Sequence, residues 1–262
     1  ELTLALHKVF DSPKDKILFD VGHQSYVHKI VTGRNEEFST LRKRGGIGPF
    51  LNPEESEHDA FISGHAGSGL SAASGIAAAN PDSKIIVVVG DASIANGTSL
   101  EALNDIGGRF KNIIILLNDN EMSIGENVGS LSRFFSKLLV SKTYMNLKDE
   151  VRTLVRKAKI GKRVGGVLKR AEHSVKQFFA PMSICEDLGF KFLGVIDGHD
   201  SKELIETFEK AKTMEGPILI HVKTKKGKGY SFAEKNQEKF HGISPFDVQT
   251  GNVRKGSPSY SQ

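Results

Sequence analysis

Short runs of mainly branched apolar residues recur along the chain. They are KIIVVV (84–89), NIIILLN (112–118), FKFLGVI (190–196) and PILIHVK (217–223), with KILFDVG (16–22) as a fifth candidate. A strand with one face in water alternates polar and apolar residues, whereas a continuous apolar run is typical of a parallel strand covered on both faces. The pattern therefore predicts a parallel sheet enclosed by helices.

Helical periodicity appears between these runs. In 98–110, apolar residues recur every three or four positions, and Gly107-Gly108 is predicted to end the helix. The stretch 201–213 repeats the pattern, with Asp200 before it as a predicted N-terminal cap. Because strands and helices alternate, we predict an α/β fold with a doubly wound, mostly parallel sheet flanked by helices.

Two segments depart from this alternation. Residues 131–180 have helical but poorly punctuated patterns and are interpreted as a helical excursion from the sheet. Residues 243–262 are rich in Ser, Pro and Gly and are interpreted as a linker. The predicted domain therefore spans 1–242, which is long enough for one large α/β domain.

Composition narrows the class of protein. No apolar run approaches the roughly 20 residues of a membrane-spanning helix, and the single Cys185 cannot form an internal disulfide. We therefore expect a soluble, cytoplasmic protein. The formal charge is +5, and between Lys148 and Lys176 ten Lys and Arg face three acidic residues. Because no nucleic-acid-reading motif accompanies it, this stretch is interpreted as a solvated helical face and not a nucleic-acid surface.

A carboxylate directly follows one of the predicted strands. The run 84–89 ends in Gly90-Asp91, and the next strand ends in a stretch that includes Asn120. If the two strands are neighbours, Asp91 and Asn120 meet at one edge of the sheet. Carboxylate and amide oxygens suit Mg²⁺, which keeps further positions for phosphate oxygens and water.

The positive end of a helix dipole is expected at the same edge of the sheet. A helix begins near Thr98, and the backbone N–H groups of Ala92 and Ser93 are expected to be free there. A Gly-Asp pair after a strand is on its own usually a turn, but the Asn-Asp-Asn stretch after the next strand favours a Mg²⁺-bound diphosphate. No G-x-G-x-x-G, P-loop or HExxH motif and no Cys pair occurs, so nicotinamide, P-loop and zinc sites lack their signatures.

Several further motifs carry a resemblance to a known family. Besides GDASIANG they are FDVGHQSYVHKIVTGR (19–34), LRKRGGIGPF (41–50), SGHAGSGLSAASGIA (63–77), residues 118–129, GVIDGHD (194–200) and HVKTKKGKGYSFAE (221–234). In order and spacing they resemble the transketolase-type thiamine diphosphate enzymes, and most closely the 1-deoxy-D-xylulose-5-phosphate synthase family. The resemblance covers nearly the whole chain and implies the thiamine diphosphate-binding fold.

The resemblance implies roles for individual residues. Asp91, the Asn120 side-chain oxygen and the Met122 backbone carbonyl would hold Mg²⁺. The catalytic residues would be His23, His65 and His241. The cofactor, chiefly its diphosphate and thiazolium end, would be lined by His23, Gly64, His65, Ala66, Gly90, Ala92, Ser93, Asn120, Met122, Lys226 and Tyr230.

The residue types agree with most of these roles but leave alternatives open. Gly64 and Gly67 would admit close backbone approach to a ligand, and Lys226 supplies charge for phosphate. Histidines such as His23 could equally be satisfied within the core or a turn, and the lysines around Lys226 could form a solvated loop. The family has Gly where this chain has Ala92, which costs about 1 kcal/mol or more if φ there is positive.

The resemblance also implies an activity. It is the thiamine diphosphate- and Mg²⁺-dependent joining of pyruvate to D-glyceraldehyde 3-phosphate, with release of CO₂, to give 1-deoxy-D-xylulose 5-phosphate for isoprenoid and thiamine biosynthesis. A homodimer is expected. The proton-transfer Glu would lie on a pyrimidine-binding domain after the linker, so this chain is expected to be truncated and nearly inactive alone. A transketolase-like subunit of a split enzyme and a non-catalytic relic of the cofactor site stay open as alternatives.

Overall fold

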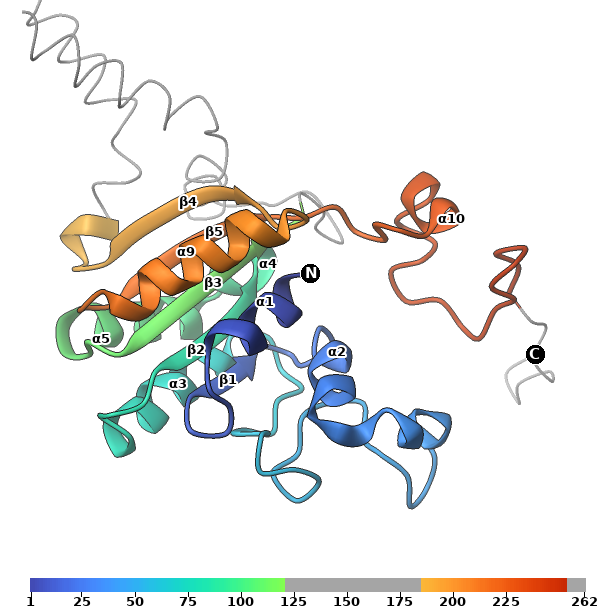
Figure 1. Cartoon of the computed structure of the whole chain (residues 1–262), viewed down its shortest axis with the longest axis horizontal. Coiled ribbons are helices and arrows are strands. Elements are labelled where there is room, and N and C mark those ends of the chain that lie inside the picture. The colour runs from blue at the N-terminus through green and yellow to red at the C-terminus, as the bar shows by residue number, and fades with distance from the viewer. Residues whose placement is uncertain (121–184, 254–262) are drawn as a thin grey trace, which may run out of the picture.

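The computed structural model describes residues 1–120 and 185–253 (Figure 1). They contain a five-stranded sheet of order β1-β2-β3-β5-β4, in which every pairing is parallel. The predicted parallel sheet is confirmed, and each predicted run contributes a strand. The strands are β1 (Lys16–Phe19), β2 (Ile85–Gly90), β3 (Ile113–Asp119), β4 (Lys191–Asp197) and β5 (Ile218–Lys223).

The apolar strands are buried on both sides of the sheet. In β2, Ile85, Val87 and Val89 belong to one apolar cluster, and Ile86 and Val88 belong to the cluster on the other side. All five side chains are at most 1% exposed. Neither face of the central strands needs polar residues, which explains the continuous apolar runs.

Helices cover both faces of the sheet (Figure 1). The first cluster contains residues of α3 (Ser68–Ala79) and α5 (Gly97–Arg109), and the second contains residues of α1 (Leu2–Val9) and α9 (Ser201–Thr213). The doubly wound architecture is therefore confirmed. The Asp200 cap is confirmed as well, because its side chain accepts hydrogen bonds from the first-turn N–H groups of α9.

The prediction that Gly107-Gly108 ends its helix is wrong. Helix α5 continues to Arg109. A Cβ atom on Gly107 would lie 1.8 Å from the backbone oxygen of Leu188, just before β4. This glycine therefore allows the helix backbone to approach another segment closely. In the sequence, a glycine needed for such a contact looks the same as a glycine that ends a helix.

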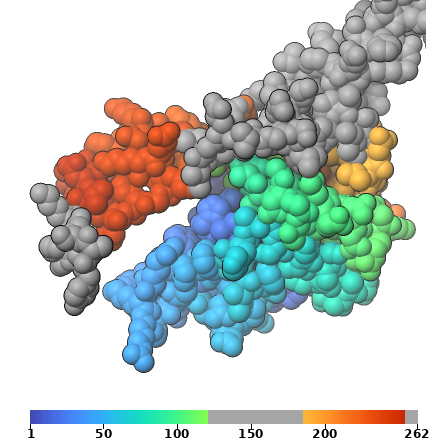
Figure 2. All heavy atoms as spheres, turned by 180° about the vertical axis from the view of Figure 1, so that it is seen from behind, coloured from blue at the N-terminus to red at the C-terminus, as the bar shows by residue number. Residues whose placement is uncertain are grey.

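The remaining elements are short. They are α2 (Tyr26–Lys29), η1 (Ile30–Arg34), η2 (Glu36–Thr40), α4 (Asp91–Ile94) and α10 (Ser231–Lys235). After β5 the chain continues as an arm, 225–253, that carries α10 (Figure 1). From behind, this arm stands apart from the N-terminal residues with a hollow between them (Figure 2).

Some predictions concern residues that the structure does not describe. The helical excursion at 131–180, with its basic stretch, lies outside the described residues, as does 254–262 of the predicted linker. Within the described ranges, no helix combines the length and the apolar character needed to cross a membrane.

Candidate functional site

Four predicted site residues follow the carboxyl ends of four adjacent strands. His23 lies in the loop after β1, Asp91 follows β2, Asn120 follows β3 and Lys226 lies in the loop after β5. Because the strands are parallel, these loops share one edge of the sheet, where open α/β sheets bind ligands. Gly90 pairs with Asn118, so the expectation that β2 and β3 are neighbours is confirmed.

Asp91 is a half-buried carboxylate at the start of α4. One oxygen accepts a hydrogen bond of 2.9 Å from the Ala92 N–H, so the expectation that this N–H is free for a ligand is wrong. Burial raises the pKa of Asp91 and the nearby Asp119 raises it further, although the Ala92 bond and Lys226 oppose this. Burial and like charge disfavour the anion, so a bound cation would stabilise it.

The donor types suit a hard cation. Within the described ranges, no group of three or more His, Cys, Asp and Glu side chains could hold a metal. The predicted set is of another kind, since it combines the carboxylate of Asp91, the amide oxygen of Asn120 and a backbone carbonyl, all oxygen donors. Met122, the predicted source of that carbonyl, lies outside the described residues. Asp91 and Asn120 are therefore the predicted Mg²⁺ ligands that the structure describes, and their role as ligands stays a prediction.

Lys226, His241 and His23 are further predicted site residues whose side chains interact at this edge. Lys226 Nζ contacts Nδ1 of His241. His23 is exposed at the surface, but partial burial of its ring lowers its pKa. Lys226 and His241 lower this pKa further, whereas Asp20 raises it. Burial lowers the pKa of Lys226, while Asp91 raises it. Asp91, His23, Lys226 and His241 therefore interact as one charged cluster, which is called the edge cluster below.

The predicted turn Gly64-His65-Ala66 precedes α3 and is exposed. Ser68 Oγ donates to the His65 carbonyl at 3.0 Å, and Asn96 Nδ2 donates to the Ala66 carbonyl at 2.9 Å. These bonds hold the turn through its backbone. They leave the imidazole of His65 on the protein surface.

Asp20 organises the start of α3 and was missed by sequence reasoning. Its carboxylate accepts hydrogen bonds of 2.8–3.0 Å from the N–H groups of Gly67 and Gly69, and it is 1% exposed. Gly67 has φ +87°, and a Cβ atom there would lie 2.1 Å from Asn96. The expectation that Gly67 admits a ligand is therefore corrected, because Asp20 and Asn96 already occupy its surroundings.

Gly90, Ala92 and Ser93 form the connection from β2 into α4. Gly90 ends the strand in extended conformation. Ala92 is exposed, and its φ is not positive, so its methyl group adds no backbone strain in place of glycine. Ser93 is 8% exposed, and its carbonyl accepts a hydrogen bond of 2.6 Å from Ser99 Oγ.

Tyr230 lies in the arm. Its ring packs against Phe232, Phe240 and Phe246, with ring centroids 5.5–5.8 Å away. Its hydroxyl donates to the carbonyl of Val248 at 2.9 Å. The structure thus places Tyr230 in an aromatic cluster, and its contact with the cofactor stays a prediction.

A polar bridge across the strand ends was not predicted. Asn118 Nδ2 donates to Gln24 Oε1 at 2.5 Å, and Thr224 Oγ1 donates to Asn118 Oδ1 at 2.8 Å. The bridge joins the loop after β1 to β3 and to the loop after β5. It was missed because the partners are remote in sequence and only the sheet order brings them together.

Comparison with known proteins decides the family. The family model described as 1-deoxy-D-xylulose-5-phosphate synthase matches residues 1–224. The chain belongs to the 1-deoxy-D-xylulose-5-phosphate synthase family. Two synthases of this name are each 52% identical to it, over 263 residues in Fusobacterium nucleatum and 268 in Caldanaerobacter subterraneus. Both matches cover 100% of this chain, which spans 44% and 43% of those relatives.

Solved structures of transketolases confirm the predicted fold of this chain. Transketolase from Campylobacter jejuni matches with a TM-score of 0.61 and 22% identity, over 90% of this chain and 34% of that chain. Transketolase from Leishmania mexicana matches with a TM-score of 0.52 and 19% identity, over 80% and 28% respectively. At these identities the likeness is one of fold.

Proposed function

We propose that this chain is the Mg²⁺- and diphosphate-anchoring domain of a thiamine diphosphate-dependent 1-deoxy-D-xylulose-5-phosphate synthase. The transferase reaction would join pyruvate to D-glyceraldehyde 3-phosphate, release CO₂ and give 1-deoxy-D-xylulose 5-phosphate, which would serve isoprenoid and thiamine biosynthesis. Family membership supports this assignment. The observation that carries it is Asp91, a half-buried carboxyl whose pKa is raised, at the end of a strand whose neighbour leads into Asn120.

The predicted site residues would bind different parts of the cofactor and its metal. Asp91, Asn120 and the carbonyl of Met122 would hold Mg²⁺, and Lys226 would place positive charge beside the diphosphate. Gly64, His65, Ala66, Gly90, Ala92, Ser93 and Tyr230 would complete the cofactor site. Bound thiamine diphosphate supplies the electron sink for decarboxylation.

Histidines would act on the substrate. Because the pKa of His23 is lowered, its imidazole is neutral near pH 7 and can donate or accept a hydrogen bond at a substrate oxygen. His241, in contact with Lys226, would lie at the same end of the cofactor. His65, exposed at the start of α3, would approach from the other loop.

The proposed assembly includes more than this chain. The pyrimidine-binding domain with its proton-transfer Glu would lie elsewhere in the whole protein, so this chain alone would be nearly inactive. We also propose a soluble, cytoplasmic homodimer, with 1–242 as the anchoring domain and 243–262 as the linker. In the arm, Phe246 of that segment packs on Tyr230 and Phe240, so its first part would stay attached to the domain.

Titration calorimetry with thiamine diphosphate and Mg²⁺ tests the proposal. We expect Mg²⁺-dependent binding by the wild-type chain and at least a hundredfold loss of affinity in Asp91→Ala, because the carboxylate joins the metal to the protein. The matched control is Asp82→Ala, an exposed aspartate in the loop before β2, which should bind as the wild type does.

Two outcomes would redirect the assignment. A folded wild-type chain that binds no cofactor at millimolar concentration would contradict the proposal and favour the relic. Recovery of synthase activity only with a separately encoded second chain would favour the split enzyme.

A further inference from the structure

Phe50 lies between the two loops that contain His23 and His65. A Cβ atom on Gly22 would lie 3.0 Å from Phe50 Cδ1, and one on Gly64 would lie 3.6 Å from Phe50 Cε2. Each glycine directly precedes one of the two histidines. The ring therefore lies beside both loops, in each at the residue next to a predicted catalytic side chain.

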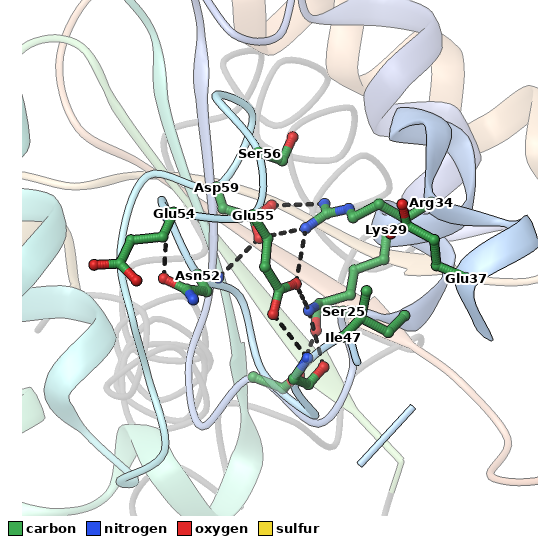
Figure 3. Close-up of polar contacts among 12 residues, drawn as sticks. Ser25, Lys29, Arg34, Glu37, Ile47, Asn52, Glu54, Glu55, Ser56 and Asp59 are labelled. Carbon is green, nitrogen blue, oxygen red and sulfur yellow. Dashed lines mark hydrogen bonds and ion pairs between the residues drawn. The ribbon is translucent and has the colours of Figure 1, made fainter. Parts of the chain in front are cut away.

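The backbone N–H and the carbonyl of Gly48, two residues before Phe50, both form hydrogen bonds with side chains. Its N–H donates to Glu55 Oε1 at 2.7 Å, and its carbonyl accepts from Lys29 Nζ at 2.9 Å. Lys29 and Glu55 also form an ion pair of 2.6 Å, in which the Lys29 side chain is 0% exposed and the Glu55 side chain 18%. Figure 3 shows the two side chains pointing toward each other.

Asn52, two residues after Phe50, is held as well. Arg34 donates to both oxygens of Asp59, at 2.6 and 2.7 Å, and Asp59 accepts from the Asn52 N–H at 2.8 Å (Figure 3). Both Lys29 and Arg34 come from the segment α2–η1. Phe50 is therefore bracketed by two backbone positions that are fixed to the same segment.

The same segment is tied to the His23 loop. Ser25 Oγ donates to the Gly22 carbonyl at 2.6 Å, and the Lys29 N–H donates to the Ser25 carbonyl at 3.0 Å. The helix that holds Gly48 through its lysine thus also holds the glycine beside His23. These bonds therefore restrain the backbone near Phe50 relative to Gly22.

Stability alone does not account for this arrangement. A buried ion pair gives little net stabilisation, because desolvation of both charges offsets their attraction. Its hydrogen bonds do fix geometry, and reaction rates depend steeply on the placement of catalytic groups. The Lys29–Glu55 pair therefore restrains the backbone at Gly48, two residues from Phe50.

We propose that Phe50 is a positioning residue that sets the spacing between the His23 and His65 loops, and that the buried Lys29–Glu55 ion pair holds Phe50 there through Gly48. The role of the two histidines in this inference rests on the proposed function. The position of the ring and of the ion pair does not.

Two variants test the inference, Phe50→Leu and the double variant Lys29→Met/Glu55→Gln. Their matched controls are Phe110→Leu, at the opposite end of the sheet, and Lys202→Met/Glu206→Gln, a surface pair whose side chains are 86% and 68% exposed. In the full-length protein, both test variants should lower kcat about ten- to a hundredfold, with a smaller change in KM. The controls should leave both constants near those of the wild type.

The second measurement needs neither cofactor nor activity. The titration of His23 is followed by NMR in the 262-residue chain, where Lys226, His241 and Asp20 are the charged groups that act on it. Loosening of its loop admits water, so both test variants should raise the His23 midpoint toward the ordinary histidine value. The Phe110→Leu and surface-pair controls should not.

The outcomes separate the two proposals. An unchanged His23 midpoint in folded Phe50→Leu would overturn the positioning role. A raised midpoint in a protein whose full-length form makes no 1-deoxy-D-xylulose 5-phosphate would refute the proposed function and keep the positioning role. If Phe50→Leu does not fold, the same His23 titration is measured in Phe50→Met, in which a flexible apolar side chain replaces the ring.

Discussion

Two aspartates, Asp59 and Asp91, lie in regions where the surroundings shift the carboxyl pKa in opposite directions. Asp59 forms a buried polar network with Arg34 and His28, and Asp91 belongs to the edge cluster. Burial opposes ionisation of Asp59, but hydrogen bonds from Arg34, His28 and Asn52 hold its pKa far below the usual range. Asp91 receives the Ala92 bond, and burial raises its pKa.

We therefore interpret Asp59 as a charge that maintains the fold and Asp91 as a charge that the proposed Mg²⁺ would bind. Asp59 is 2% exposed, and both of its oxygens have cationic partners within the chain. Asp91 has no salt bridge with a described residue. Ionisable groups whose pKa is perturbed by burial without such partners are typical of functional sites. The comparison therefore predicts opposite responses when each charge is removed.

The largest expected effect is on Asp59. The variant Asp59→Asn should lower the free energy of unfolding by about 3–5 kcal/mol, because Arg34 and His28 would stay buried without their anion. Urea denaturation at pH 7 measures it. The matched variant Asp91→Asn should change the free energy of unfolding by less than about 0.5 kcal/mol or raise it slightly, as expected for a site away from packing and internal ion pairs. Equal losses in both variants would remove the distinction.

The Asp59 comparison also has a pH dependence. The pKa of Asp59 is lowered on folding, so its contribution to the free energy of unfolding is fully present above the unfolded pKa of about 3.9. This contribution is lost as the pH falls toward the folded pKa. The stability difference between wild type and Asp59→Asn should therefore shrink below pH 4.

A smaller effect is expected at His7, which joins the network through His28. Burial, and to a smaller extent His28 and His58, lower the pKa of His7 to about 4. Between pH 6.5 and 4 the unfolded chain binds a proton there that the folded chain does not, so stability falls as the pH falls. In His7→Gln this decline should be weaker. Identical pH profiles of the urea midpoint in the two proteins would show that His7 is not responsible.

The smallest effect concerns the edge cluster itself. Lys226→Met removes a positive charge that lowers the pKa of His23, so the NMR titration midpoint of His23 should rise. Lys235→Met, an exposed lysine at the end of α10, is the control and should leave the midpoint unchanged. A midpoint that also stays unchanged in Lys226→Met would separate His23 from the cluster.

Much of the fold could be predicted because its signals are local. The runs at 84–89 and 112–118 became β2 and β3 with their order as expected, since apolar residues on both sides of a strand leave few arrangements other than a covered parallel sheet. The Asp200 cap likewise depends on residues two and three positions away. Gly107 failed as a stop signal because its reason is a contact with Leu188, far along the chain.

The candidate site was predictable only in part. Residues next to strand ends, such as Asp91 and Lys226, could be placed on one edge as soon as the strands were recognised. Asp20 and Gln24 could not, because an acidic or amide side chain near a turn is common and their partners, Gly67 and Asn118, are remote in sequence. Phe50 ends the family motif at 41–50, but nothing in the sequence indicates that it lies beside Gly22 and Gly64.

The sequence by itself therefore determined which segments are buried, the parallel sheet, the family and the strand end that bears Asp91. The tertiary structure alone decided that Lys29 and Glu55 hold Gly48 and that Phe50 lies beside Gly22 and Gly64. It also decided that Asp91, among the described residues, forms no salt bridge such as that between Asp59 and Arg34. The physical reason is the distance along the chain over which each signal acts. Burial patterns repeat within a few residues, whereas ion pairs and ring contacts depend on which loops the sheet brings together.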